Sequence, residues 1–200
     1  HYTSRKTNAS LVYFSITTSN DLVAYELADS PGRTFYQNAG STTRKGVEFL
    51  IKHQFNKRFQ AQITYNYANF KYQDFEQNGE NYSGNNLPGL PSDFGTLHLN
   101  YHWENKFQVN YTKTYRGDLF ADNRNENQVD QFFRDDVSLR LPLKKIGQKT
   151  SLIMGCTNLF NTLYSDNIRI NAFGNRYFEA APTREIYTSL QWQFSRLIIL

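Results

Sequence analysis

The chain has 200 residues and a formal net charge of +4, and only 39% of its residues are hydrophobic although it contains 14 Tyr and 16 Phe. No apolar run approaches the roughly 18 residues that a membrane-spanning helix needs. The single cysteine, Cys156, excludes an internal disulfide framework and a cysteine-based zinc site. The sequence has no long basic run and no nucleic-acid-binding motif, which argues against a nucleic-acid partner.

Apolar and polar residues alternate in one segment after another, which is the period of a β-strand with one apolar and one polar face. We expect strands at residues 11–16, 46–55, 59–67, 96–102, 107–115, 137–143, 149–160 and 183–194. Residues 22–27 are also extended, either as a continuation of the first strand or as a strand of their own. The apolar face of the last strand ends in Trp192 and Phe194, which suit the boundary between lipid and headgroups.

The connections between these strands alternate in length. Short turns are expected at 56–58, 103–106 and 144–148, and long polar segments at 28–34, 74–92, 117–130 and 161–182. An up-and-down meander with its short turns at one end is typical of an outer-membrane barrel. Strands of about ten residues also suit a tilted membrane strand. The sequence therefore predicts an all-β fold, a transmembrane antiparallel up-and-down β-barrel with about eight strands in this chain.

Several short motifs resemble those of TonB-dependent receptor barrels, and they follow the family's order from about residue 34 to 194. They are Tyr-Gln-Asn-Ala-Gly at 36–40, Arg-Lys-Gly-Val-Glu at 44–48, Leu-Pro-Gly-Leu-Pro at 87–91, Asn-Leu-Phe-Asn at 158–161 followed by Tyr164, Arg-Tyr-Phe-Glu at 176–179 with Pro182 and Arg184, and the terminal aromatic Phe194. The continuation 195–200 departs from the family pattern, which stops at the terminal aromatic.

The resemblance implies an energy-coupled importer in the outer membrane of a Gram-negative bacterium, with a barrel of roughly 22 strands. Residues 1–194 would be the C-terminal part of that barrel and 195–200 an atypical extension. The opening residues read like the middle of a strand or loop, so we expect a longer chain. The implied partners are outer-membrane lipid, the plug domain of the same chain, TonB, and a scarce ligand such as an iron–siderophore complex. No cofactor is expected.

The long loops hold the candidates for ligand binding, because the resemblance places them outside the cell and loops often carry function. The candidates are Tyr72, Phe75, Tyr82, Phe120, Arg124, Phe173, Arg176 and Tyr177. An arginine would suit an anionic ferric chelate, and aromatic side chains would suit its rings.

The residues of the family motifs are expected to be structural. They are Asn38, Gly40, Gly46, Val47, Glu48, Asn158, Leu159, Phe160 and Arg184, with Trp192 and Phe194 as the barrel-assembly signal. Glycine in a strand permits a bend or a close backbone approach. By alternation Glu48, Lys52 and Arg140 would face the barrel interior, where polar residues are the default.

The sequence contains no convincing catalytic or metal site. His98 and His102 would share a strand face but lie about 13 Å apart at ~3.3 Å per residue, too far for one metal. The adjacent Asp135 and Asp136 would point to opposite faces and cannot pair in catalysis. No catalytic triad, P-loop or dinucleotide fingerprint is present, so we do not expect an enzyme.

Three alternatives remain open. A complete eight-stranded outer-membrane barrel could act as an adhesin or structural protein, because eight strands can close around side chains. An outer-membrane enzyme barrel would need a catalytic constellation at a strand end. A soluble β-sandwich binding module would bury its apolar faces against each other.

Overall fold

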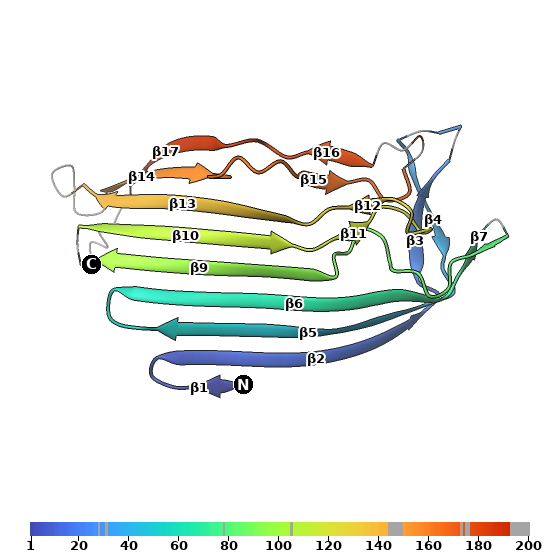
Figure 1. Cartoon of the computed structure of the whole chain (residues 1–200), viewed down its shortest axis with the longest axis horizontal. Coiled ribbons are helices and arrows are strands. Elements are labelled where there is room, and N and C mark those ends of the chain that lie inside the picture. The colour runs from blue at the N-terminus through green and yellow to red at the C-terminus, as the bar shows by residue number, and fades with distance from the viewer. Residues whose placement is uncertain are drawn as a thin grey trace, which may run out of the picture.

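The computed structural model describes residues 1–27, 29–30, 32–77, 79–104, 106–143, 150–172, 174 and 177–192. Nine of its strands form one antiparallel sheet in which every strand pairs with its neighbours in chain order (Figure 1). These strands are β1 (Tyr2–Thr3), β2 (Thr7–Ser19), β5 (Ser41–Gln54), β6 (Phe59–Asp74), β9 (Asp93–Trp103), β10 (Phe107–Arg116), β13 (Phe132–Pro142), β14 (Thr150–Thr157) and β17 (Glu185–Trp192). The predicted antiparallel meander is thus confirmed.

The four long connections contain small hairpins of their own. These are β3 (Leu22–Glu26) with β4 (Thr34–Asn38), β7 (Glu76–Gln77) with β8 (Glu80–Asn81), β11 (Leu119–Phe120) with β12 (Gln128–Val129), and β15 (Ser165–Ile168) with β16 (Phe178–Ala180). The question left open for residues 22–27 is answered, because β3 is separate from β2. The long connection is wider than the expected 28–34, because it also contains β3, which ends at Glu26, and β4, which begins at Thr34.

Most of these hairpins gather at one end of the sheet, whereas the short turns after β5 and β9 lie at the other (Figure 1). In the described part of the chain no helix combines the length and the apolarity needed to cross a bilayer.

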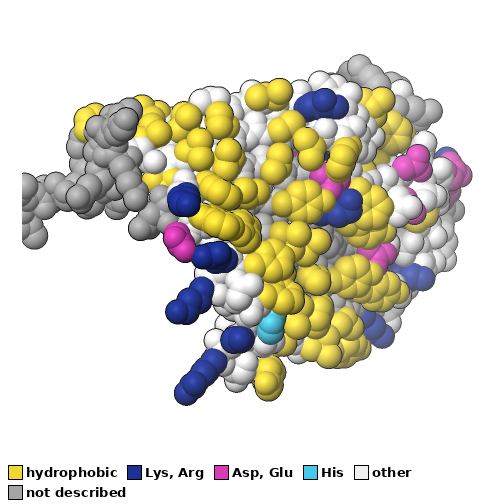
Figure 2. Space-filling view, turned by 60° about the vertical axis from the view of Figure 1, so that its left-hand side comes forward, with side chains coloured by type: hydrophobic (Ala, Val, Ile, Leu, Met, Phe, Trp, Pro, Cys, Tyr) yellow, Lys and Arg dark blue, Asp and Glu magenta, His cyan; other side chains and the backbone are white. Residues whose placement is uncertain are grey.

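The two faces of the sheet differ in polarity, as the alternation predicted. Exposed apolar side chains share one face: Leu11, Tyr13, Phe49, Ile63, Tyr65, Tyr67, Met154, Ile186 and Leu190. Figure 2 shows apolar side chains gathered over a broad surface, with most of the Lys and Arg side chains toward its margin. Glu48, Lys52 and Arg140 lie on the opposite, polar face, opposite Asn66, Gln62 and Gln108 respectively. Large apolar side chains left exposed over a whole sheet face are what a lipid-facing wall requires.

Aromatic side chains border this apolar face at both ends. Near the short turns, the rings of Trp103 and Phe107 stack 6.2 Å apart, and the Arg58 guanidinium lies 4.6 Å from the Trp103 ring. Near the long loops, Tyr115 and Phe133 stack with centroids 4.8 Å apart. Phe107 and Tyr115 lie on the same strand, β10, and the stretch between them matches the roughly 9–11 residues with which a tilted strand crosses a bilayer. These two aromatic girdles, Trp103 with Phe107 and Tyr115 with Phe133, therefore mark the two membrane boundaries.

Gly46 leaves room for an aromatic ring on the polar face. Phe14 lies opposite Gly46 across the β2–β5 pair, and its ring is 6.0 Å from that of Phe70. A Cβ at Gly46 would overlap the carbonyl oxygen of Tyr67 and lie 2.5 Å from the Phe14 ring. Gly155 is similarly covered by the ring of its cross-strand partner Tyr187. These glycines therefore admit rings that would otherwise have no place against the sheet.

The long loops pack through two small apolar clusters instead of lying loose. The first consists of Val23, Ala39, Tyr72, Phe75, Tyr82 and Leu87. The second consists of Leu119, Ala121, Val129, Ala172 and Tyr177. Each cluster joins residues from different connections, so the loops stabilise one another.

A pair of asparagines, here termed the asparagine bridge, joins the two clusters. The Asn123 backbone N–H donates to Asn171 Oδ1 at 2.9 Å, and Asn171 Nδ2 donates to Asn123 Oδ1 at 3.1 Å. Asn171 Nδ2 also donates to the Ala24 carbonyl at 2.8 Å. The Tyr72 hydroxyl donates to Asn123 Oδ1 at 2.8 Å, and Asn85 Nδ2 donates to the Asn123 carbonyl at 2.8 Å. All four long connections thus meet at these two side chains.

Gly46→Ala should lower the stability of the purified protein in detergent by about 1–3 kcal/mol, because a Cβ overlaps backbone that cannot move aside. Thermal unfolding followed by circular dichroism measures the effect. Gly95→Ala is the matched control, since the nearest atom to its Cβ, the Thr64 carbonyl oxygen, is 3.3 Å away. Equal unfolding temperatures for the two variants would contradict this account of Gly46.

Asn123→Ala should loosen the loops while leaving the sheet intact. The substitution leaves the buried Tyr72 hydroxyl without its acceptor, which costs about 1–3 kcal/mol. Hydrogen exchange should become faster in residues 75–92 and 158–184 and stay unchanged in β5 and β10. Asn69→Ala, at an exposed position on β6, is the control. Unchanged loop protection in the Asn123 variant would show that the bridge does not hold the loops.

Candidate ligand-binding site

A cavity of about 470 Å³ opens between the long loops. Its walls come from all four connections: Tyr25, Leu27, Gln37, Gln77, Tyr82, Asp122, Asn123, Arg124, Glu126, Asn127, Asn171 and Tyr177. The asparagine bridge lies in its wall, so the contacts that join the loops also shape the cavity. We term it the apex cavity.

Two tyrosines bring hydroxyl groups and ring faces to the apex cavity. Burial raises the pKa of Tyr177, and the nearby Asp122 carboxylate raises it further. Burial likewise raises the pKa of Tyr82, together with the hydrogen bond from its hydroxyl to Glu80 at 2.7 Å. Both phenols are therefore neutral at ordinary pH and can donate hydrogen bonds.

Two of the charged side chains in the cavity wall, Arg124 and Asp122, are held by other groups of the loops. Arg124 pairs with Glu80 at 2.6 Å. The hydrogen bond from Tyr82 lowers the pKa of Glu80, and Arg124 lowers it further. Asp122 accepts hydrogen bonds from the backbone N–H groups of Glu126 at 3.1 Å and Asn127 at 2.8 Å, and from Asn127 Nδ2 at 2.5 Å. Its carboxylate thus fixes the turn between β11 and β12.

Seven of the eight predicted ligand-binding residues fall into three groups. Tyr72 and Phe75 are only 1% and 2% exposed and pack inside the first cluster, 4.6 Å apart between ring centroids. Tyr82 and Tyr177 are mostly buried but reach the cavity wall, where the exposed Arg124 joins them. Phe173 and Arg176 lie outside the described residues. Contact of any of these residues with a ligand stays a prediction.

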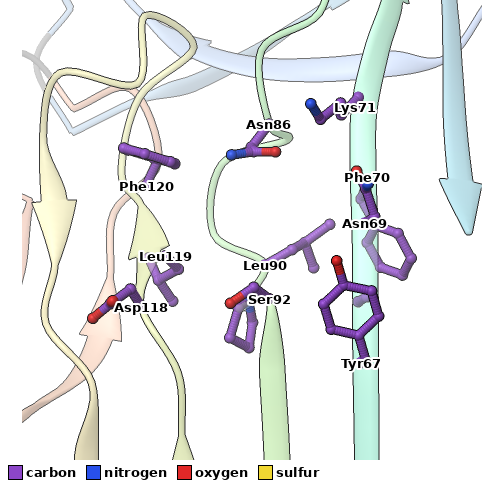
Figure 3. Close-up of a pocket in the computed structure, with 12 residues that line it drawn as sticks. Tyr67, Asn69, Phe70, Lys71, Asn86, Leu90, Ser92, Asp118, Leu119 and Phe120 are labelled. Carbon is purple, nitrogen blue, oxygen red and sulfur yellow. The ribbon is translucent and has the colours of Figure 1, made fainter. Parts of the chain in front are cut away.

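Phe120, the remaining candidate, lines a second cavity of about 320 Å³. Figure 3 shows Phe120 and Leu119 on one side of it, Tyr67 and Lys71 of β6 on the other, and Leu90 between them. This cavity lies where β6 continues past its pairing with β9, which ends at Tyr67.

The asparagines of the family motifs cap the ends of strands. Asn38 Oδ1 accepts from the N–H of Gly40 at 2.7 Å, and Gly40 has a φ of +67° beside the Asp74 backbone. Asn158 has a φ of +50°, and its Oδ1 accepts from the Thr162 N–H at 2.8 Å. Both motifs therefore close turns at the base of the long loops.

The remaining motif residues surround these turns. The Leu159 N–H donates to the Asp135 carbonyl at 2.7 Å, and the Arg184 N–H donates to Asn161 Oδ1 at 2.9 Å. Phe160 is 68% exposed. Val47 lies beside Tyr67 on the apolar face, and Glu48 lies on the other face. Trp192 ends β17, and Phe194 lies outside the described residues.

The residues examined as possible catalytic or metal groups have other partners. His98 shares a hydrogen bond of 3.0 Å with Thr112 Oγ1. Asp135 pairs with Lys113 at 3.2 Å, whereas Asp136 pairs with Arg134 at 3.1 Å. Among the described residues no group of three or more His, Cys, Asp or Glu gathers around a possible metal position.

Asn123 and Asn171 line the cavity and join its loops, but the sequence did not predict a role for either residue. The only local signal is at Asn171, whose φ of +52° suits asparagine better than most residues. Asn123 is held by partners distant in sequence, which no local pattern reveals.

Comparison with known proteins identifies the family. The family described as TonB dependent receptor-like, beta-barrel matches residues 2–159. The solved structure of the ferric yersiniabactin uptake receptor FyuA from Yersinia pestis has a TM-score of 0.76 and 16% identity over 97% of this chain and 28% of its own. The siderophore receptor PiuA from Acinetobacter baumannii has a TM-score of 0.69 and 19% identity over 94% and 26%. The copper transporter OprC has a TM-score of 0.74 and 16% identity over 96% and 29%.

At these identities the structural likeness shows the fold, and the chain spans under a third of the length of each of these proteins. They are described as receptors and a transporter. The family match extends over more than half of the chain. The chain therefore belongs to the TonB-dependent receptor-like β-barrel family of Gram-negative outer-membrane proteins.

Proposed function

We propose that residues 1–194 form the C-terminal part of a larger receptor barrel, of roughly 22 strands, that imports an iron–siderophore complex. The observation that carries this proposal is the convergence of four long loops on one cavity, in a chain of this family. The described sheet is open, with β1 and β17 at its edges, and open edges inside a bilayer need further strands. Residues 195–200 would be an extension beyond the last strand.

In this proposal the loops capture the ligand outside the cell and the barrel wall guides it inward, with no chemistry on the ligand. The polar face, with Glu48, Lys52 and Arg140, would contact the plug domain of the full-length chain. TonB would then pull on the plug with energy from the inner membrane. The apolar face contacts outer-membrane lipid throughout.

Import of another metal cargo is a second candidate, favoured by the likeness to the copper transporter OprC at a TM-score of 0.74. The two candidates differ in what the loops recognise. A chelate of siderophore size must fill a cavity of some hundreds of Å³, whereas a bare ion needs only a few convergent ligands.

The receptor that contains this chain should restore uptake of radiolabelled iron from at least one ferric siderophore in an iron-starved host that lacks its own siderophore receptors. Uptake should be lost in the same host without TonB, because the transport step needs TonB. Labelled copper serves as the parallel cargo. A folded, surface-exposed receptor that imports copper but no ferric siderophore would contradict the proposal and favour the second candidate. Import of neither would leave the adhesin or structural role as the better account.

A further inference from the structure

We infer that the apex cavity selects iron chelates without net charge and discriminates against strongly anionic ones. This inference rests on the proposed function and narrows the class of siderophore. It follows from the kind of polar group in the cavity wall and from the sign of its charge. The wall carries five amide side chains and three tyrosines: Gln37, Gln77, Asn123, Asn127, Asn171, Tyr25, Tyr82 and Tyr177.

The described residues of the wall carry a net negative charge. Its described charged residues are one cation, Arg124, and two carboxylates, Asp122 and Glu126, which gives a net charge of −1. Glu80, immediately beside the wall, already neutralises Arg124 through their 2.6 Å ion pair. An anionic ligand would therefore gain little from the arginine unless it displaced Glu80. The screening length is about 8 Å at physiological salt, so charges lining one small cavity still act on a ligand there, and added salt weakens their effect.

A second observation argues against Arg124 as a binding group for an anionic ligand. The Tyr82 hydroxyl also donates to Glu80, at 2.7 Å, so Glu80 is held by two partners. To bind an anionic ligand, the Arg124 guanidinium would have to leave Glu80. The ligand would then lie near a Glu80 carboxylate that has lost its cationic partner and repels it. Exposed pairs of this kind contribute little to stability, but they change the charge that a ligand meets.

Neutral polar groups suit a neutral chelate. A glutamine amide such as that of Gln37 can donate and accept hydrogen bonds, and tyrosine rings offer flat apolar faces. The amides of Asn123, Asn127 and Asn171 already bond to groups within the loops and shape the wall. A ferric tris-hydroxamate has this character, because its three singly charged groups cancel the charge of Fe(III), and its iron-bound carbonyl and N–O oxygens can still accept hydrogen bonds. A ferric tris-catecholate is triply anionic and would meet the negative wall.

Binding to the purified full-length receptor tests the inference, with a neutral ferric tris-hydroxamate and a ferric tris-catecholate as probes and tryptophan fluorescence as the signal. The neutral chelate should bind at least tenfold more tightly at low salt, and the gap should narrow as salt screens the repulsion. Tighter binding of the catecholate would overturn the inference but leave the import of iron chelates standing. Binding of neither chelate, together with failure of iron uptake, would overturn the proposed function and this inference with it.

Glu126→Lys tests the sign of the field, because it changes the net charge of the wall from −1 to +1. The affinity for the catecholate should rise by about tenfold, with a much smaller response for the neutral chelate. An unchanged catecholate affinity would show that the charge of the wall does not govern selection.

Gln37→Leu tests the amide contacts. Loss of one net hydrogen bond should weaken binding of the neutral chelate about fivefold. Gln73→Leu is the matched control, because Gln73 is exposed on β6 and is not part of the cavity wall. Equal effects of the two substitutions would overturn the assignment of Gln37 to the ligand.

Discussion

The structure depends on the pairing of backbone groups along its strands, since a bilayer offers no water to replace a missing hydrogen bond. The β2–β5 ladder runs without a break from the Thr7–His53 pair to the Ser19–Ser41 pair. Continuous pairing fixes the register, and register fixes which side chains face lipid. The apolar face and the aromatic side chains at its two ends therefore follow from strand pairing. Gly46 does not disrupt the β2–β5 pairing, because the residues on both sides of it are paired.

The same constraint explains how the long loops are anchored to the sheet. β6 continues to Asp74, well past its last pair with β9, so its free edge needs other partners. The segment before β9 supplies them: the Leu87 N–H donates to the Phe70 carbonyl at 2.9 Å, and the Tyr72 N–H to the Asn85 carbonyl at 3.0 Å. This returning segment brings Leu87 and Tyr82 onto Tyr72, and the first apolar cluster forms on the overhang. The long loops thus pack on the part of β6 that extends beyond its pairing with β9.

The sequence could predict the strands of the main sheet and their apolar face. For the candidate site it could predict only which types of residue the loops would carry. Alternation in residues 59–67 marks a strand because lipid and water each select one face, and motifs such as Asn158 to Asn161 mark turns because asparagine tolerates positive φ. The loop hairpins have strands of only two to five residues, too short for a visible period. The burial of Tyr72 and Phe75 was not visible in the sequence, because partners far along the chain cover them. The ion pair between Arg124 and Glu80 could not be predicted from the sequence either, because the two residues lie in different loops.

Overall charge is a poor guide to the ligand of such a protein. The chain carries a net charge of +4, but its cations serve different surfaces. Arg58 and Lys106 lie against Trp103 near the short turns, and Lys113 is held by Asp135 beside the Phe133 ring. Cations at these positions suit the boundaries of a membrane, where aromatic rings and lipid headgroups meet. The loops, by contrast, place Asp122 and Glu126 in the cavity wall, so the described wall residues have a net charge of opposite sign to that of the chain as a whole.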